Sequence, residues 1–281
     1  MTTAFVLSGG ASLGALHVGM LRSLAEAGIT PDLITATSVG AVNGGWIASR
    51  PDAAGIGSLE DLWRSLSRTD VFPTNPVLGL RGFLGLRPNL VSGNGLRRLL
   101  AEHLEFARLE DAPIPLHVVA TDVLTGEDAL LSSGDAVDAI TASAAIPAVF
   151  PPVNINGRYY MDGGVVNNTP LSHAVALGAD RVWVLQTGYS CALSRPPRGA
   201  LAMALHALNL AINQRLAADI TRFEGVVELH VIPQPCPLSV SPVDFSQSAE
   251  LIERSYAAAR TWLAAPRPHT GQAALLALHR H

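Results

Sequence analysis

Residues 4–49 read AFVLSGGASLGALHVGMLRSLAEAGITPDLITATSVGAVNGGWIAS, and this stretch decides the fold. An apolar run at 4–7 predicts a buried strand, and after a turn of small residues comes a helical pattern that Gly28 closes. A second apolar run at 33–37 predicts another strand, which leads through Ser38 into a helix of small residues. Strand, helix, strand, helix at this spacing indicates parallel strands joined by crossover helices.

The rest of the chain continues this alternation. Turn signals at Thr125-Gly126 and Asn156-Gly157 predict two hairpins. Further helices are expected at about 94–103, 135–144, 171–177, 200–223 and 246–263, and further strands at 116–121, 181–186 and 226–232. The sequence predicts a single α/β domain at 1–265, with a mostly parallel central sheet flanked by helices, and a C-terminal tail at 266–281.

Composition excludes several classes of protein. Of 281 residues, 48% are hydrophobic and 15% charged, and the net charge is −4, which argues against intrinsic disorder and against nucleic-acid binding. Cys191 and Cys236 are too few for a disulfide scaffold and lack metal-site spacing. The longest apolar stretch, 200–212, falls short of the roughly 20 residues that span a bilayer, and 4–7 is too short for a signal-peptide core. We therefore expect a cytoplasmic protein.

Ala36-Thr-Ser38-Val-Gly40 nearly matches the G-x-S-x-G motif and lies where a strand turns into a helix. A tight turn in that position exposes a serine hydroxyl at the carboxyl end of the sheet, and the small residues on either side avoid collisions. Ser38 is therefore the candidate nucleophile. A serine that only caps the helix would give the same local pattern.

The loop Ser8-Gly-Gly-Ala-Ser-Leu-Gly14 joins the first strand to its helix. Ala15 stands where a phosphate-binding Walker loop needs lysine, so that interpretation fails. Backbone N–H groups of about Gly10 and Ala11 could instead form an oxyanion hole, which binds the negative oxygen of a tetrahedral acyl intermediate. A plain tight turn is the alternative.

Asp162-Gly163-Gly164 is the third candidate, because a serine nucleophile needs a base. The apolar residues 159–161 before it favour partial burial, which would raise the pKa of the carboxyl. A turn aspartate is the alternative. Histidines downstream of Asp162 are weaker candidates for the base because each lies in a helix, an apolar strand or the tail: His173, His206, His230, His269, His279 and His281.

The three motifs occur along the chain in the order glycine-rich loop, serine motif and D-G-G. Two further runs precede the aspartate, Ser143-Ala-Ala-Ile-Pro147 and Phe150-Pro-Pro152. Together these features resemble the patatin-like phospholipase family over about residues 3–190. The resemblance implies a three-layer α/β/α fold and a catalytic dyad of Ser38 and Asp162 without histidine. It also implies an oxyanion loop containing Gly9, Gly10, Ala11 and Gly14. No metal or organic cofactor is expected.

Two departures from the family pattern stand out. Ala11 holds the third glycine position of the loop, and Leu13 replaces a basic residue. Both changes keep the backbone donors but remove a cation that would influence substrate preference. Ala36 replaces the first glycine of the serine motif.

The expected function is serine hydrolysis of lipid acyl esters such as phospholipids or lysophospholipids, with peripheral contact at a membrane. Acyl transfer or thioester hydrolysis through the same acyl-enzyme stays open, as does a non-catalytic lipid-binding role. An acyltransferase of the malonyl-transfer type is disfavoured because that family pairs its serine with histidine and lacks D-G-G. Residues 70–95 are rich in Pro, Gly and Leu and form a candidate lid, or alternatively a loop with its own small core.

Overall fold

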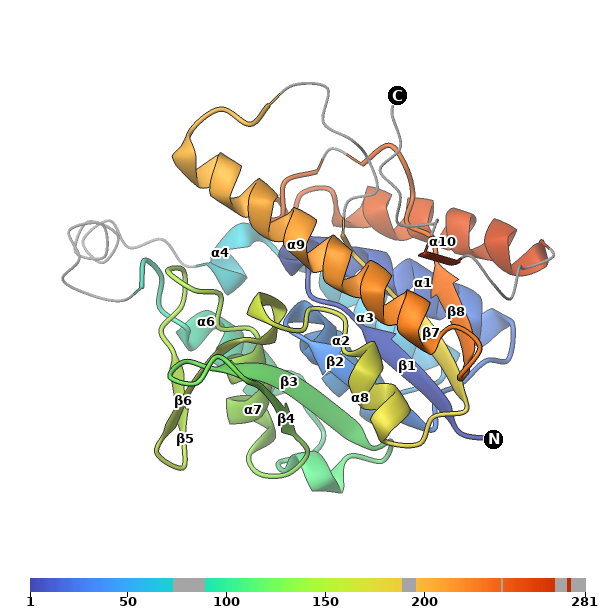
Figure 1. Ribbon diagram of the computed structural model, residues 1–281, viewed down its shortest axis with the longest axis horizontal. Helices are drawn as coiled ribbons and strands as arrows, with labels where there is room; N and C mark the ends of the chain where they lie inside the picture. Colours follow the sequence, from blue (N-terminus) through green and yellow to red (C-terminus); the bar gives the residue numbers. More distant parts are fainter. Residues whose placement is uncertain (73–88, 189–195, 239, 266–271, 274–281) are drawn as a thin grey trace.

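The computed structural model describes residues 1–72, 89–188, 196–238, 240–265 and 272–273 (Figure 1). Their strands form one mixed sheet in the order β5-β6-β3-β2-β1-β7-β8, with β4 paired to β3. The strands are β1 (Thr3–Leu7), β2 (Leu33–Thr37), β3 (Leu116–Asp122), β4 (Asp128–Leu131), β5 (Val153–Ile155), β6 (Arg158–Asp162), β7 (Arg181–Leu185) and β8 (Glu228–Ile232). β3, β2, β1, β7 and β8 pair in parallel, whereas β4, β5 and β6 join the sheet by antiparallel pairing. The predicted mostly parallel sheet is confirmed.

Helices cover both faces of this sheet (Figure 1). The α-helices are α1 (Ala15–Glu26), α2 (Val39–Ser49), α3 (Ala53–Ser65), α4 (Arg68–Val71), α6 (Asn94–His103), α7 (Ala136–Ser143), α8 (Leu171–Ala176), α9 (Ala200–Phe223) and α10 (Ser248–Ala264). Three short 3-10 turns are η1 (Ala11–Gly14), η2 (Leu109–Asp111) and η3 (Gly163–Val165). One face packs on a large core with α1, α2, α3 and α10, and the other packs with α8 and α9.

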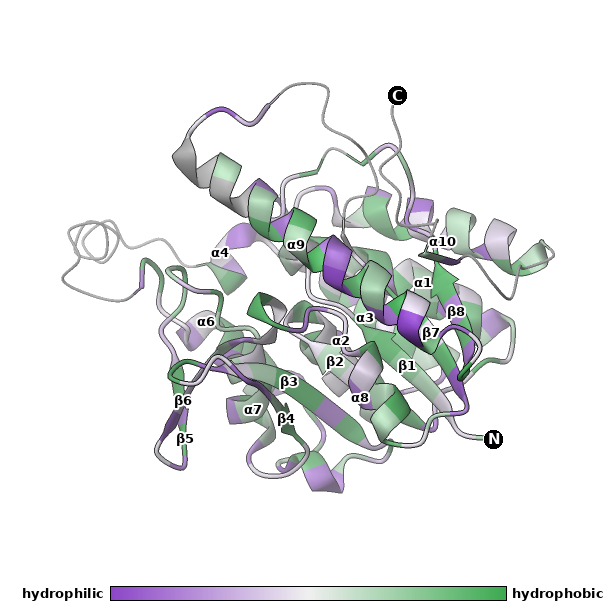
Figure 2. Cartoon of the chain, in the orientation of Figure 1, coloured by the Kyte–Doolittle hydropathy of each residue, from purple (hydrophilic) through white to green (hydrophobic). Residues whose placement is uncertain are grey.

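The central strands are buried on both faces, which is why they are apolar throughout. In β1, Phe5 and Leu7 join the larger core, whereas Ala4 and Val6 pack toward α8 and α9. Figure 2 shows β1 as a hydrophobic ribbon inside the molecule. Strands buried in this way are typical of parallel sheets with helices on either side.

The register of β3 explains how distant segments meet. β4 pairs with Val118–Thr121, so it occupies one edge of β3. β2 pairs with residues 116–119 and β6 with residues 120–122, so these two strands share the opposite edge, one after the other. Thr37, the last residue of β2, pairs with Val119, and Asp162, the last residue of β6, pairs with Ala120. The ends of β2 and β6 therefore lie together.

One helix of the structure was not predicted, and two predicted segments lie mostly outside the described residues. The helix α3 was not predicted, although Asp52 caps it and Ile56, Leu59 and Trp63 are its buried face at helical spacing. Most of the candidate lid, 73–88, and most of the tail, 266–271 and 274–281, lie outside the described residues. Within the tail, Gln272 accepts a hydrogen bond from the Val231 N–H of β8 through Oε1, at 2.8 Å.

Candidate active site

Ser38 lies in a strained turn between β2 and α2. Its backbone has φ 55° and ψ −126°, a left-handed φ that is uncommon for a residue with a side chain. Gly40 allows the turn to press against β1, because a Cβ there would collide with the Leu7 carbonyl. This is the strand-to-helix elbow that the serine motif predicted.

Ser143 holds the elbow from behind. Its Oγ accepts a hydrogen bond from the Ser38 N–H at 2.8 Å and donates one to the Val119 carbonyl at 2.6 Å. Ser143 ends α7 and is fully buried, so both bonds are shielded from water. The sequence singled out Ser143 only as part of a motif and gave it no role.

The Ser38 and Asp162 side chains meet directly. Ser38 Oγ donates a hydrogen bond to Asp162 Oδ2 at 2.6 Å, and both residues are buried. The second carboxylate oxygen, Oδ1, accepts the Gly164 N–H at 2.7 Å. The backbone of Asp162 is fixed as well, because its N–H donates to the Ala145 carbonyl at 2.9 Å. The two candidates that the sequence placed 124 positions apart are thus brought together.

Burial raises the pKa of Asp162 from 3.8 to about 6, while the hydrogen bonds from Ser38 and Gly164 act in the opposite direction. The expected increase in pKa is confirmed in direction. Its cause is not the whole 159–161 segment, since Tyr159 is half exposed on the strand that carries Asp162. A carboxylate with a raised pKa is a stronger base than an ordinary surface aspartate.

The loop of residues 8–14, which we call the glycine loop, lies against Ser38. A Cβ built on Gly9 would sit 3.0 Å from Ser38 Cβ, so only glycine allows this approach. Within the described part of the chain, the Gly10 and Ala11 N–H groups have no hydrogen-bond acceptor. Ala11 has φ 51°, the left-handed region, at the start of η1. A loop that lies against the serine and carries two backbone N–H groups without an acceptor among the described residues has the groups that an oxyanion hole requires.

Gly9 and Gly14 serve the loop in another way. The Gly9 N–H already donates to the Asn168 carbonyl at 3.0 Å, so it is not free to bind a ligand. A Cβ on Gly14 would collide with Val39 and Trp63, so this glycine permits the packing of α2 against the loop. Both are therefore residues that shape the loop, which leaves the N–H groups of Gly10 and Ala11 as the candidate donors.

Thr187 and Asn168 hold the loop in place. Thr187 Oγ1 donates to the Gly9 carbonyl at 2.7 Å, and Asn168 Nδ2 donates to the same oxygen at 3.2 Å. The Thr187 N–H also donates to Ser8 Oγ at 2.9 Å. Neither residue received a role from the sequence. Asn168 follows the D-G-G motif closely, whereas only the pairing of β1 with β7 brings Thr187 to the loop.

The histidines take other partners. His173 lies 3.0 Å from Asp128, and His230 lies 2.8 Å from Glu228. His206 is on α9, and His269, His279 and His281 lie outside the described residues. Among the described residues, no histidine hydrogen-bonds Ser38 or Asp162.

His17 is a buried histidine to which the sequence assigned no role, because it precedes Ser38 and Asp162 in the chain. Asn43 Nδ2 donates to Nδ1 of His17 at 3.2 Å, so the ring proton is on Nε2, which donates to the Leu185 carbonyl at 3.0 Å. Burial lowers the pKa of His17 to about 4, which keeps the ring neutral. Asn43 also donates to the Gly14 carbonyl at 3.0 Å, so this network supports the end of the glycine loop.

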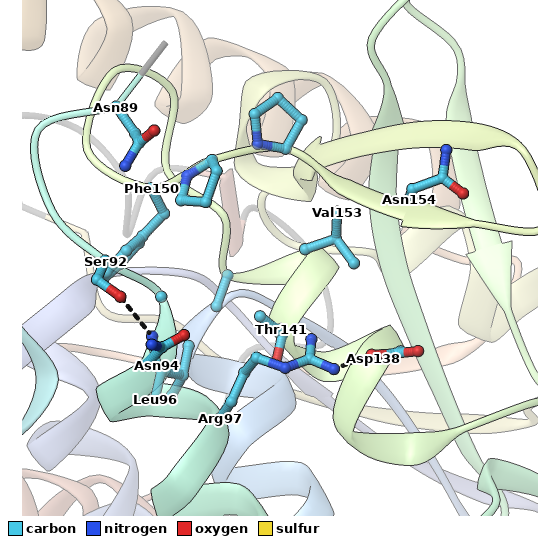
Figure 3. Close-up of a pocket in the computed structure, with 14 residues that line it drawn as sticks. Asn89, Ser92, Asn94, Leu96, Arg97, Asp138, Thr141, Phe150, Val153 and Asn154 are labelled. Carbon is cyan, nitrogen blue, oxygen red and sulfur yellow. Dashed lines mark hydrogen bonds and ion pairs between the residues drawn. The ribbon is translucent and has the colours of Figure 1, made fainter. Parts of the chain in front are cut away.

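A cavity of about 610 Å³ lies beyond α7, between α6 and the segment 150–154 (Figure 3). Arg97 and Asp138 form an ion pair on its wall. Thr141 also lines it, two residues before Ser143, and its Oγ1 is buried with no hydrogen-bond partner. The cavity therefore shares the helix α7 with the Ser38 elbow but lies on another part of it.

The described residues offer neither a metal centre nor a membrane-spanning helix. No group of three or more His, Cys, Asp or Glu side chains there is arranged to hold a metal ion. None of the described helices has the length and apolar character needed to span a membrane.

The patatin-like phospholipase family model matches residues 5–175, more than half of the chain and the stretch that carries Ser38, Asp162 and the glycine loop. The chain belongs to the patatin-like phospholipase family. The family predicted from the motifs is confirmed.

Other patatin-like proteins resemble the chain over about two thirds of its length. Lysophospholipase NTE1 of Mycosarcoma maydis is 28% identical over 67% of this chain and 10% of its own. Patatin-like phospholipase domain-containing protein 6 of mouse is 30% identical over 66% of this chain and 14% of its own. The chain thus spans only a small part of the curated relatives it matches.

Among solved structures, VipD from Legionella pneumophila is similar with a TM-score of 0.48 and 15% identity, over 93% of this chain and 66% of VipD. ExoU in its complex with SpcU, from Pseudomonas aeruginosa, gives a TM-score of 0.47 and 18% identity over 94% of this chain and 51% of its own.

Proposed function

We propose that this patatin-like protein is a serine hydrolase of lipid acyl esters, with phospholipids or lysophospholipids as substrates. The observation that carries the proposal is the 2.6 Å hydrogen bond from Ser38 Oγ to Asp162 Oδ2. The adjoining glycine loop adds the N–H groups of Gly10 and Ala11, which have no acceptor among the described residues. A nucleophile, a base and two donors for an oxyanion are the parts that acyl transfer to serine requires. Family membership and relatives named lysophospholipase support a lipid ester as the substrate.

In the first half of the reaction, Asp162 takes the proton of Ser38 as Oγ attacks the ester carbonyl carbon. The carbonyl oxygen becomes negative and accepts hydrogen bonds from the Gly10 and Ala11 N–H groups. Collapse of this intermediate breaks the bond to the alcohol, and Asp162 returns the proton to the departing oxygen. The products are a free alcohol, such as a lysolipid or glycerophospho compound, and an acyl-Ser38 ester.

The second half repeats these steps with water. Asp162 accepts a proton from a water molecule, whose oxygen attacks the acyl carbon while the same two N–H groups stabilise the oxyanion. Ser38 then leaves and regains its proton from Asp162, which releases the fatty acid. The raised pKa of Asp162 suits both directions of transfer, because a group with a pKa near the working pH can accept and return a proton.

The test is a panel of phosphatidylcholine, lysophosphatidylcholine, monoacylglycerol and acyl-thioester substrates, with release of fatty acid as the measurement. The control variants are Ser38→Ala and Ser58→Ala, of which the second changes an exposed serine on α3. We expect fatty-acid release from at least one oxygen ester of a lipid, a loss of roughly 10⁴-fold or more in kcat for Ser38→Ala, and no loss for Ser58→Ala. Activity retained by Ser38→Ala, or confined to thioesters, would contradict the proposal.

A further inference from the structure

The first half of α9 carries no charge, and its described side chains are only partly buried or exposed. Residues 199–214 contain no Asp, Glu, Lys or Arg. Of the side chains described there, at 203 and 206–214, none is fully buried, and Met203 and Leu208 are 46% and 42% exposed. The second half differs, because Leu216, Ile220 and Phe223 are buried against the sheet. The polar residues His206, Asn209 and Asn213 of the first half are half-buried, whereas its exposed face is apolar at Met203, Ala207, Leu208 and Ala211. An apolar helix face that the protein leaves exposed suits contact with an apolar partner.

The length of α9 explains why its first half is not buried against the sheet as its second half is. It connects β7 to β8, which run in parallel, so it begins at the carboxyl edge of the sheet and returns to the opposite edge. A helix of 24 residues is about 36 Å long, whereas a strand of 5 residues is about 17 Å long. The N-terminal part of α9 therefore projects past the ends of the strands (Figure 1).

This projection is close to the proposed active site. α9 contacts η3, the turn that directly follows Asp162. A Cβ on Gly188 would lie 3.1 Å from Asn213 Oδ1 of α9, and Gly188 follows Thr187, which holds the glycine loop. The 199–214 half of the helix is therefore next to the loop-holding residues at its C-terminal end, around Asn213.

A second group of exposed apolar side chains lies along the same carboxyl edge. Leu124 is 84% exposed at the end of β3, and Tyr159 is 50% exposed where β6 begins. The two segments touch, since the Val123 N–H donates to the Tyr159 carbonyl at 2.8 Å. Val165 of η3 is 37% exposed. We call Val123, Leu124, Tyr159, Val165, Met203 and Leu208 the apolar rim.

The chemistry of the rim favours a lipid surface as its partner. It offers apolar side chains on several separate elements rather than one shaped groove, which suits a fluid apolar phase better than a folded protein. The uncharged run 199–214 is shorter than the roughly 20 residues that cross a bilayer, so the helix would lie in the interface. Arg158, beside Tyr159, is within 4.0 Å of Asp122, so its charge is partly balanced.

We propose that the apolar rim docks on a phospholipid surface and so holds the carboxyl edge of the sheet, where Ser38 lies, against that surface. This inference rests on the proposed function for the nature of the substrate at Ser38. Because the protein carries a net charge of −4, apolar contact and not charge attraction drives the docking. Binding to zwitterionic phosphatidylcholine vesicles should therefore persist at about 1 M salt, where charges are screened within about 3 Å.

The binding experiment uses the full chain with Ser38→Ala, which prevents turnover, in co-sedimentation with phosphatidylcholine vesicles. In that background, Leu124→Glu and Leu208→Glu each place a charge on the rim. Ala218→Glu is the matched control, because Ala218 is exposed on the packed half of α9. We expect each rim variant to weaken vesicle binding by roughly tenfold or more and the control to bind like the parent.

A second measurement uses the same substitutions with Ser38 present. The ratio of activity on phospholipid vesicles to activity on a short soluble ester should fall by roughly tenfold for the rim variants and stay constant for Ala218→Glu. Docking without any ester hydrolysis would contradict the proposed function and leave the docking surface standing. Hydrolysis with no vesicle binding, or with an unchanged ratio in both rim variants, would overturn the docking proposal.

The other occupant that an apolar rim could have is a second copy of the chain. Light scattering after size exclusion separates the two cases. If the parent is a dimer that Leu208→Glu converts to a monomer, and neither form binds vesicles, the docking proposal is overturned. A monomer that binds vesicles through the rim supports it.

Discussion

Ser38 Oγ and Asp162 Oδ2 lie 2.6 Å apart, although 124 positions separate the two residues in the chain. Their contact follows from the pairing of β3, which places the last residue of β2 and the last residue of β6 against the neighbouring residues Val119 and Ala120. The serine follows β2 at once, and the aspartate ends β6. The proposed dyad is therefore held by the hydrogen bonding of the sheet and does not depend on a flexible loop.

The proposed base predicts the pH dependence of the reaction. Asp162 must be ionised to accept the Ser38 proton, and burial raises its pKa to about 6. We expect kcat/KM for a soluble ester to rise with pH through about 6 and then to level off. Initial rates between about pH 4.5 and 8.5 measure this profile. A flat profile across that range would argue against Asp162 as the base.

The same burial predicts that Asp162 lowers the stability of the folded protein at neutral pH. Its pKa is raised from 3.8 in the unfolded chain to about 6 in the folded protein. The protonated carboxyl therefore contributes its full stability below pH 3.8, and this contribution is lost as the pH rises through about 6. At pH 8, Asp162→Asn should increase the free energy of unfolding by up to about 3 kcal/mol, with the gain disappearing toward pH 4. Urea unfolding at several pH values measures the difference.

Asp122→Asn is the matched control for that experiment. Hydrogen bonds from the Thr125 and Leu124 N–H groups lower the pKa of Asp122, the opposite direction. The ionised Asp122 carboxylate therefore stabilises the fold above pH 3.8, and this effect is lost as the pH falls. Asp122→Asn should accordingly reduce the free energy of unfolding at pH 8. If both variants changed stability in the same direction, the assignment of a destabilising carboxylate to Asp162 would fail.

Gly10 should tolerate no side chain, because a Cβ there would overlap Thr187. Gly10→Ala is expected to displace the glycine loop and reduce kcat by roughly 10²- to 10³-fold, the usual loss when an oxyanion donor is misplaced. Gly57→Ala is the control, since nothing lies within 4 Å of a Cβ at that position in α3. Steady-state kinetics on a soluble ester compare the two. Full activity in Gly10→Ala would exclude this loop as the oxyanion hole.

Ser143 is expected to position the nucleophile. In Ser143→Ala the buried Ser38 N–H loses its acceptor, which should lower the free energy of unfolding by about 1–3 kcal/mol. Relaxation of the strained elbow should also lower kcat while the pKa in the pH profile stays near that of the parent. Thermal unfolding and kinetics on a short ester measure both effects. A stability loss without any change in kcat would reduce Ser143 to a structural role.

Local sequence patterns were sufficient for much of this fold. The apolar run at 33–37 and the small residues around Ser38 predicted the strand, elbow and helix, and the long helix 200–223 was placed with its observed bounds. These features depend on neighbours in the chain, which a sequence displays directly.

Features that depend on pairing between distant strands were not predicted. Thr187 reaches the glycine loop only because β7 lies beside β1, and Ser143 reaches Ser38 only because α7 packs on β3. The sequence placed Asp162 in the site through a family resemblance, whereas the shared edge of β3 gives the physical reason. The helix α3 was missed although its cap and apolar spacing were legible.

Labelling with a fluorophosphonate, followed by mass spectrometry of the peptides, tests the central proposal most directly. We predict a single adduct on Ser38 in the parent and in Asp122→Asn, with labelling at least about 100-fold slower in Asp162→Asn. An adduct on another side chain, or equal labelling rates with and without the Asp162 carboxylate, would contradict the Ser38–Asp162 dyad.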